Sequence, residues 1–531
     1  MNDLVPRLDL AEAHTGRRPR SALFPYQERG VDFSIEAMRV ALFCEPGTGK
    51  TAMFLTAASD LIVAGAVERV LYISHPRVVL SVPGGEIPRW EHLAHLNYVP
   101  VHAHGDEKLE LLRAPADIYG VTFQGLQYIV DNAKHIRPFD MVVIDESTGV
   151  SNPQAKRTRY AAALTKRAQY VICATGTPTS QGYYKLWSQL FMLDRGARLG
   201  ATPSPFKRRY FTQRGFQLHL NPGADKEIHA KVEDIVFVLR AEDWLSIPPV
   251  LEQQISVQLP ADAREAYDKL EDELVALLRD GGLIDAKNAA AVLVKLHQMA
   301  QGSVLDRSGQ AHRIHDEKLD ALAELVEELD GEPLLVAYHY RADISRLANR
   351  FPEAEVLDTR NAAALRDSLD RWGRREIPLL FIHSASAGVG LDGLQAGGCH
   401  HLAYFSPAWS FEQRVQTTAR LKRTGQTAQS VIVHNIIAVN TVDERVLEVL
   451  QGRRKGLETF MDALAYRLAE KAGDTSAEGI ERMRERLREL RKKAAAAHPD
   501  KGGTEADFIA AHAEAQAAKE QLKQAEQGDI R

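Results

Sequence analysis

The sequence predicts an α/β protein with two parallel β-sheet lobes, a helical insertion between them and a C-terminal helical appendage. Apolar runs rich in Val and Ile alternate with helical stretches in two separate parts of the chain, which is typical of parallel sheets with helices on both faces. Residues 262–300 instead combine Ala, Leu, Lys and Glu with helical spacing, interrupted at Gly281 and Gly282. From about Gly473 the composition becomes rich in Ala, Arg and Lys. We therefore divide the chain into a polar lead-in (1–20), a first α/β lobe (21–240), a helical insertion (241–311), a second α/β lobe (312–465) and a helical tail (473–531).

Composition indicates the class of protein. The chain has 531 residues, of which 45% are hydrophobic and 26% charged, as expected for a globular protein of several domains. Its net charge of −5 means that any nucleic-acid surface must be local. The three cysteines and the scattered histidines lack metal-ligand spacing, so zinc is not expected. No secretion signal and no apolar run of membrane length is visible, so we expect a soluble, cytoplasmic protein without a membrane partner.

The first lobe begins with the strongest chemical signal. The apolar run 40–43 predicts a buried strand, which breaks into a glycine loop and then into a run of good helix formers. The loop and the first helical residues are Gly47, Thr48, Gly49, Lys50 and Thr51. Strand, glycine loop and helix predict a phosphate-binding loop, in which backbone N–H groups and a helix N-terminus surround phosphate oxygens. We expect Lys50 to reach the β- and γ-phosphates of ATP and the Thr51 hydroxyl to bind Mg²⁺. A plain strand–turn–helix corner is the alternative.

Gln27 precedes the glycine loop by 20 residues. Its amide carries a donor and an acceptor together, so it can pair with both kinds of group on an adenine edge. We expect this side chain to bind the adenine base of ATP.

Further strands are expected wherever a short apolar run is bounded by turn residues. Those of the first lobe lie at 70–74, 118–122, 141–144, 170–174 and 235–239, and those of the second at 334–338, 355–357, 379–383, 401–405 and 431–437.

Two acids, Asp145 and Glu146, follow the strand at 141–144. The carboxyl end of a parallel strand lies at the ligand-binding edge of its sheet. There Asp145 can hold Mg²⁺, directly or through water, and Glu146 can orient and deprotonate an attacking water. Such pairs also occur as helix caps, but their place behind a glycine loop favours catalysis. Thr175 and Thr177, in a later strand-end turn, carry hydroxyls that can relay contacts from the ATP site.

A polar run at 413–426 in the second lobe contains Arg420 and Arg423. On a helix, residues three apart share a face. Two guanidinium groups that point into a cleft suit the charge that develops on a transferred γ-phosphoryl group. A solvated basic helix face is the alternative.

Together these stretches resemble the helicase superfamily 2 motors (DEAD/DEAH-like), and specifically the Swi/Snf-type ATPases. The particular markers are Thr-Gly-Thr-Pro at 175–178 with Leu186 and Trp187 downstream, and Arg-x-x-Arg-x-Gly-Gln at 420–426. The other matching stretches, in order, are Tyr26-Gln27, 47–51, 145–148 and 386–391. The resemblance covers roughly residues 21–455.

The resemblance implies two RecA-like lobes with ATP in the cleft and DNA, usually duplex, across both. The first lobe would supply Gln27, Lys50, Thr51, Asp145 and Glu146, and the second Gln416, Arg420 and Arg423. The implied function is an ATP-dependent DNA translocase or helicase, which couples hydrolysis to movement on DNA. An RNA helicase and a nucleotide-switched scaffold are the alternatives. The chain departs from the pattern at Thr148, where His is usual, and at Ser386, where Arg is common.

The tail carries a separate motif, His498-Pro499-Asp500, between two helical stretches. It resembles the core of a J-domain, the module that stimulates Hsp70 ATPases, although Ala497 replaces the usual aromatic residue. An Hsp70 partner is one interpretation. Residues 481–493 hold seven Arg and Lys against three Glu, so a basic hairpin that grips DNA or another protein is the other.

Overall fold

The computed structural model describes residues 17–454 except 83–84, 181, 215–216, 246, 280–285, 307, 360 and 388–390. Two compact units divide the chain, Met1–Asn221 with Ile235–Glu458, and Pro222–Asp234 with Thr459–Arg531. Both α/β lobes belong to the first unit, and helix α9 (Ala224–Val232) belongs to the second. The predicted tail at 473–531, with its His-Pro-Asp motif, lies outside the described residues, as does most of the lead-in.

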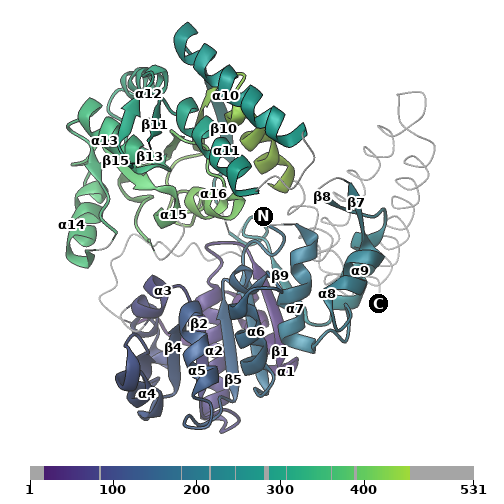
Figure 1. Ribbon diagram of the computed structural model, residues 1–531. Helices are drawn as coiled ribbons and strands as arrows, with labels where there is room; N and C mark the ends of the chain where they lie inside the picture. Colours follow the sequence, from purple (N-terminus) through teal and green to yellow (C-terminus); the bar gives the residue numbers. More distant parts are fainter. Residues whose placement is uncertain are drawn as a thin grey trace, which may run out of the picture. The chain divides into compact units, whose positions relative to one another are not determined.

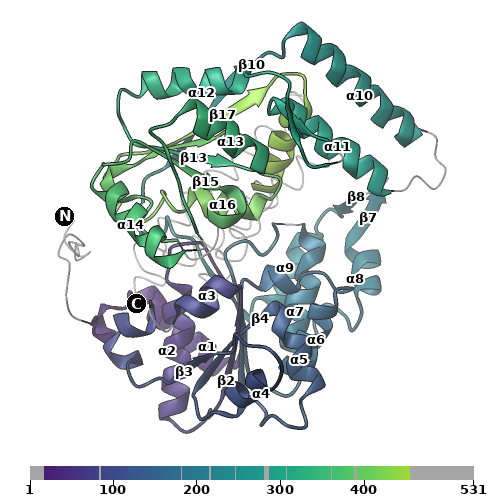
Figure 2. The same ribbon diagram turned by 60° about the vertical axis from the view of Figure 1, so that its left-hand side comes forward.

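The first lobe is built on a seven-stranded sheet in which all neighbouring strands run parallel (Figures 1 and 2). Its strand order is β3-β4-β2-β5-β6-β1-β9. The strands are β1 (Arg39–Cys44), β2 (Val70–Ser74), β3 (Tyr98–Pro100), β4 (Ile118–Thr122), β5 (Met141–Asp145), β6 (Tyr170–Thr175) and β9 (Val236–Leu239). The helices are α1 (Pro25–Glu36), α2 (Lys50–Val63), α3 (Pro76–Ser81), α4 (Gly105–Arg113), α5 (Leu126–Asp131), α6 (Lys156–Thr165), α7 (Leu186–Asp194) and α8 (Pro203–Tyr210). A short hairpin, β7 (Phe211–Arg214) and β8 (Gln217–Leu220), follows α8.

Helices cover both faces of this sheet (Figure 2). On one face, Leu42 of β1 and Val143 of β5 share a buried cluster with Phe54 of α2. On the other face, the Cys173 thiol of β6 contacts the carbonyl of Gln189 in α7 at 3.7 Å. Burial on both faces explains why these strands read as continuous apolar runs in the sequence. The strand ends therefore remain as the places where polar chemistry can be assembled.

The second lobe is built on a six-stranded parallel sheet of order β10-β17-β16-β13-β15-β14, drawn mostly in green in Figure 1. The strands are β10 (Val250–Val257), β13 (Leu334–Tyr338), β14 (Glu355–Val356), β15 (Leu379–His383), β16 (His401–Tyr404) and β17 (Val431–Ala438). The helices are α12 (Glu317–Glu328), α13 (Arg341–Arg350), α14 (Ala362–Gly373), α15 (Ser384–Ala387) and α16 (Phe411–Thr418). The expected α/β class with two parallel sheets is thus confirmed.

The region between the lobes differs in part from the prediction. Helices α10 (Ala261–Arg279) and α11 (Ala286–Ala300) confirm the helical pair, and a small hairpin, β11 (Ser303–Leu305) and β12 (Ala311–Arg313), follows it. The predicted helical insertion, 241–311, is wrong at 250–257, which form β10 at the edge of the second sheet. Most residues of β10 are exposed, and its centre reads Glu-Gln-Gln, so no apolar run marks the strand in the sequence.

A buried polar network ties α11 to the second lobe. Lys318 of α12 donates to Gln301, just beyond α11, at 2.8 Å, and forms an ion pair with Asp443. All three side chains are fully buried. No helix in the described part of the chain is both long and apolar enough to cross a bilayer.

Candidate active site

The glycine loop joins the carboxyl end of β1 to α2, as the sequence predicts. Gly47 and Gly49 adopt φ values of +86° and +83°, which residues with a Cβ rarely adopt. At Gly49 a second constraint acts, because an added Cβ would lie 2.1 Å from Nε2 of Gln27. The loop is therefore a left-handed turn directly before a helix N-terminus, the backbone arrangement that suits a phosphate group.

Gln27 lies beside this loop. The side chain is buried, its Nε2 donates to the Thr48 carbonyl at 3.0 Å, and its Oε1 accepts from the Phe24 N–H at 2.9 Å. Both ends of the amide thus bond to the chain and connect the start of α1 to the loop. To bind adenine, Gln27 would have to exchange these two bonds for bonds to the base.

Lys50, the first residue of α2, points its ammonium group back over the loop. Nζ donates to the carbonyls of Cys44 at 2.7 Å and Glu45 at 3.3 Å. Phosphate oxygens would replace these carbonyls as stronger, charged acceptors. This position is compatible with the role expected for Lys50, which stays a prediction.

Asp145 ends β5 and is buried. Its Oδ2 accepts from the Tyr72 hydroxyl at 2.7 Å, and its Oδ1 accepts from the Glu146 N–H at 3.1 Å. Burial and then the charge of Glu146 raise the pKa of Asp145 to about 6, although Tyr72 and Lys50 act in the opposite direction. Sequence reasoning did not identify Tyr72, because a tyrosine inside an apolar strand reads as a core residue.

Glu146 adopts a φ of +54°, which is unusual for a residue with a side chain. Its Oε2 accepts from the Thr175 hydroxyl at 3.2 Å, and Thr175 Oγ1 in turn accepts from the Thr177 N–H at 3.2 Å. The carboxyl ends of β5 and β6 therefore hold the two acids together with a hydroxyl group. Strained backbone of this kind is often found at active sites, where surrounding contacts maintain it.

The donor set at this edge fits Mg²⁺. Asp145 offers a carboxylate, and Thr51, one residue after Lys50, offers a hydroxyl. Burial and the neighbouring charge of Glu146 raise the pKa of Asp145, and a divalent cation beside this carboxyl group would lower it. Mg²⁺ in such sites takes one or two protein ligands together with substrate phosphates.

The second lobe contributes α16 and the turns after it. α16 ends at Thr418, so Gln416 is helical whereas Arg420 and Arg423 lie in turns. The predicted shared helix face of the two arginines is therefore wrong. Beyond Thr418 turn-type hydrogen bonds appear: the Arg420 N–H donates to the Thr417 carbonyl, and the Arg423 N–H donates to the Leu421 carbonyl.

The turns nevertheless bring the two guanidinium groups together. Both contact Asp392, Arg423 with an Nη1–Oδ1 distance of 2.8 Å and Arg420 with 3.7 Å. Asp392 directly follows a matching stretch of the sequence, 386–391, but sequence reasoning did not single it out. The predicted pair of arginines is thus assembled, with a carboxylate between them that the sequence analysis did not identify.

Polar contacts join the edges of the two lobes. The Thr148 hydroxyl, two residues after Glu146, donates to Oε1 of Glu412 in α16 at 2.6 Å. Burial and then the nearby charge of Glu146 raise the pKa of Glu412 to about 7. Arg77 donates to the carbonyls of Thr359 and Ser386. The position where the family resemblance expects His is therefore occupied by a threonine that bonds to the second lobe.

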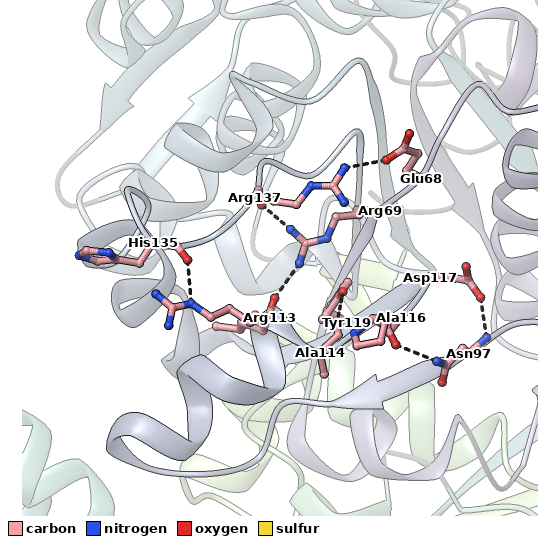
Figure 3. Close-up of a pocket in the computed structure, with 12 residues that line it drawn as sticks. Glu68, Arg69, Asn97, Arg113, Ala114, Ala116, Asp117, Tyr119, His135 and Arg137 are labelled. Carbon is pink, nitrogen blue, oxygen red and sulfur yellow. Dashed lines mark hydrogen bonds and ion pairs between the residues drawn. The ribbon is translucent and has the colours of Figure 1, made fainter.

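A pocket of about 510 Å³ lies in the first lobe but not at this site (Figure 3). Its lining includes Arg69 and Asp117, which directly precede β2 and β4 and so lie at the amino ends of the strands. The glycine loop and the two acids follow carboxyl ends. Arg69 donates to the carbonyls of Leu112 and Arg137, so the pocket's basic centre is already bonded to the protein. The geometry gives no reason to assign this pocket to ATP.

Comparison with known proteins places these features in a family. A model of the SNF2-related domain matches residues 26–305, more than half of the chain. A putative protein, p41, of Acyrthosiphon pisum secondary endosymbiont phage 1 is 33% identical over 463 residues, which cover 83% of this chain and 98% of p41. The DNA annealing helicase and endonuclease ZRANB3 of Bos taurus is 23% identical over 491 residues, or 86% of this chain and 42% of that protein.

A solved SWI2/SNF2 ATPase core of Sulfolobus solfataricus in complex with dsDNA aligns with a TM-score of 0.40 and 22% identity, covering 83% of this chain and 92% of the other. The chain spans nearly all of the phage protein but less than half of the bovine relative. The match over residues 26–305 and the 33% identity to a relative of almost equal extent show that the chain belongs to the SNF2-related family.

Proposed function

We propose that this protein is an ATP-dependent DNA translocase or helicase of Swi/Snf type, which couples ATP hydrolysis to movement on DNA. The observation that carries the proposal is the assembly of two half-sites in one compact unit. A phosphate loop with an Asp-Glu pair stands on the carboxyl edge of the first sheet, and a pair of arginines stands on the second lobe. Neither half can hydrolyse ATP efficiently alone, so turnover depends on the arrangement of the lobes.

Each residue has a role that follows from its position. The loop N–H groups and Lys50 bind the β- and γ-phosphates, and Gln27 binds the base. Glu146 accepts the proton of the attacking water while the Thr175 hydroxyl holds its Oε2. Arg420 and Arg423 stabilise charge on the γ-phosphoryl group, and Gln416 lies on the same segment and completes the second-lobe half of the site. Mg²⁺, held by Asp145 and Thr51, would neutralise phosphate charge when bound.

DNA is the proposed partner of the motor. The bovine relative is named as a DNA annealing helicase and endonuclease, and the family resemblance implies duplex DNA. The net charge of −5 requires local basic surfaces for such a partner. An RNA helicase and a nucleotide-switched scaffold are the competing functions, and both act in the same soluble, cytoplasmic setting that we propose for the motor.

ATP turnover titrated with nucleic acids tests the proposal. We expect duplex DNA to stimulate hydrolysis more strongly than single-stranded DNA or RNA, and a triplex-displacement assay to detect movement. Stronger stimulation by RNA would favour an RNA helicase. Turnover that no nucleic acid changes would favour the scaffold.

For the tail we propose a partner-binding role. The His498-Pro499-Asp500 motif suggests recruitment of an Hsp70, and the basic run 481–493 suggests a grip on DNA or a protein. Asp500→Asn removes a charge with little change of shape, so it should abolish stimulation of an Hsp70 ATPase only if the first role holds. Neutralising Arg484, Arg488 and Arg491 should flatten the salt dependence of DNA binding only if the second holds. DNA-stimulated ATP turnover of the Asp500→Asn protein serves as the control.

A further inference from the structure

Two lysine side chains lie beside one tyrosine after the carboxyl end of β6, and an arginine follows one of them in the sequence. Tyr184 and Lys185 belong to a short 3₁₀ turn, η6 (Tyr183–Lys185), and Lys207 and Arg208 lie in the last turn of α8. The Nζ atoms of Lys185 and Lys207 lie 5.0 Å and 5.3 Å from the centre of the Tyr184 ring. We call Tyr184, Lys185, Lys207 and Arg208 the basic patch.

The fold brings these residues together from two segments. η6 leads directly into α7, and α8 lies beside α7 in both views (Figures 1 and 2). The indole N–H of Trp187 in α7 donates to the Gly200 carbonyl at 2.8 Å, which fixes the loop that leads to α8. The patch is therefore part of the packed first lobe.

In the part of the chain that the structure describes, no acidic side chain pairs with the basic groups of the patch. Among the described residues, neither lysine nor Arg208 forms an ion pair, and Lys207 and Arg208 are exposed. Other basic residues of this lobe have carboxylate partners, such as Arg20 with Asp60 and Arg198 with Asp194. Two ammonium groups beside one ring repel each other, so their arrangement is most favourable when an external anion lies over them.

We propose that the basic patch binds the phosphate backbone of duplex DNA. The inference rests on the proposed function, which requires a local DNA surface on a chain of net negative charge. Its position supports it, because η6 follows the end of β6 that holds Thr175 against Glu146. Lysines that contact phosphates supply affinity without reading sequence, which suits a motor that moves along DNA.

A purely structural role is the alternative to be separated. Cations in the last turn of α8 interact favourably with the helix dipole, and a cation over an aromatic ring is attracted to its face. These effects stabilise the lobe but leave DNA binding unchanged. The salt dependence of DNA affinity distinguishes the two, because removing one lysine–phosphate interaction lowers the slope of log K against log salt by about 0.9 for duplex DNA.

The test uses the whole 531-residue chain and a duplex DNA of mixed sequence. In the double variant Lys185→Gln with Lys207→Gln, we expect the slope to fall by about 1.8 and the affinity to weaken alike for different sequences. The matched control is Lys134→Gln with Lys166→Gln. It removes two exposed positive charges that precede β5 and β6, at the opposite edge of the sheet, and its slope should stay at the wild-type value.

A second variant keeps the experiment informative about folding. Lys185→Arg with Lys207→Arg preserves both charges, so it should retain the wild-type slope, and ATP binding by every variant verifies the fold. If the Gln variant keeps the wild-type slope of log K against log salt, or if the slope falls equally in the control, the basic patch does not bind DNA. Either result would leave the proposed function intact. If the wild-type protein translocates on DNA and the Gln variant keeps the wild-type slope, only the assignment of the basic patch is wrong. If the wild-type protein binds no duplex DNA, both the basic patch and the proposed function are wrong.

Discussion

Lys50 and Glu146 occupy the same edge of the first sheet but have different partners. The Lys50 ammonium group donates to the carbonyl oxygens of Cys44 and Glu45, whereas Glu146 is held by the Thr175 hydroxyl next to a second acid. We predict that Lys50→Ala weakens ATP binding roughly tenfold or more, because losing a hydrogen bond to a charged group costs about 1.5–3 kcal/mol. Glu146→Gln should leave ATP affinity near the wild-type value and reduce turnover by about 10²–10⁴, the usual scale for a general base.

Equilibrium binding of a fluorescent ATP analogue and single-turnover hydrolysis check this pair. Lys134→Ala, an exposed lysine far along the chain from the loop, is the control and should change neither measurement. Equal losses of nucleotide affinity in both variants would contradict the assigned roles.

In the second lobe, a prediction about ATP turnover concerns the side chain of Arg423. We expect Arg423→Ala to lower turnover at least ~10³-fold while ATP binding stays nearly intact, because a transition-state arginine acts on charge that develops during the reaction. The side chain of the neighbouring Lys422 has no hydrogen-bond or ion-pair partner among the described residues, and its backbone N–H, which donates to the Thr418 carbonyl at 3.0 Å, is kept in Lys422→Ala, so that variant is a matched control. A loss smaller than tenfold in single-turnover experiments would return Arg423 to a solvated surface role.

At the scale of elements, most strands of the two sheets could be predicted from the sequence, because their apolar runs are buried on both faces. Strand β10 could not be predicted, because it is an exposed edge strand without an apolar run. Strand β3 could not be predicted either, because it consists of only three half-buried residues. The active-site edge was predictable for the same reason as the strands: the glycine loop and Asp145 directly follow apolar runs. Glu412 and Asp392 were not, because their significance depends on contacts with Thr148 and Arg423, far away in the sequence.

Glu412, at the start of α16, should make the stability of the protein depend on pH. Glu412 has a pKa of about 7 in the folded protein, above its ordinary value of 4.5, because of burial and the charge of Glu146. Between these two values the folded chain holds a proton that the unfolded chain has lost, so stability falls as pH rises from 4.5 to 7. Glu412→Gln cannot ionise and still accepts from Thr148. It should therefore be more stable than wild type at pH 8, by about 1–3 kcal/mol, since one pKa unit is worth about 1.4 kcal/mol.

Denaturant unfolding at pH 5 and pH 8 measures this difference, which should shrink toward pH 5. Thr148→Val is the companion variant, because it removes the 2.6 Å hydrogen bond while Glu412 keeps a carboxyl group that can ionise. We expect it to be less stable than wild type at both pH values. A pH-independent effect of Glu412→Gln would show that its carboxyl group does not titrate in this range.

At the scale of the whole molecule, Asp392 is contacted from both lobes. Besides Arg420 and Arg423, Arg89 of the first lobe approaches it with an Nη2–Oδ2 distance of 3.6 Å. Burial alone would raise the pKa of Asp392, but the charge of Arg423 and its hydrogen bond outweigh it and lower the pKa. Asp392 therefore stays ionised and neutralises the arginines that the proposed mechanism assigns to the γ-phosphoryl group. Hydrolysis requires Arg423 to exchange this carboxylate for phosphate oxygens.

We accordingly predict that Asp392→Asn raises ATP turnover in the absence of DNA by up to about fivefold, because a partly exposed ion pair contributes about 0.2–1 kcal/mol. Maximal turnover with saturating DNA should change less, so the ratio of stimulated to basal rate should fall. Glu86→Gln is the control, since it removes another acidic partner of Arg89 without touching Arg423. Steady-state rates with and without duplex DNA decide the matter. A fall in both rates would show that Asp392 positions the arginines for catalysis, and the restraint inferred from the three contacts would then be wrong.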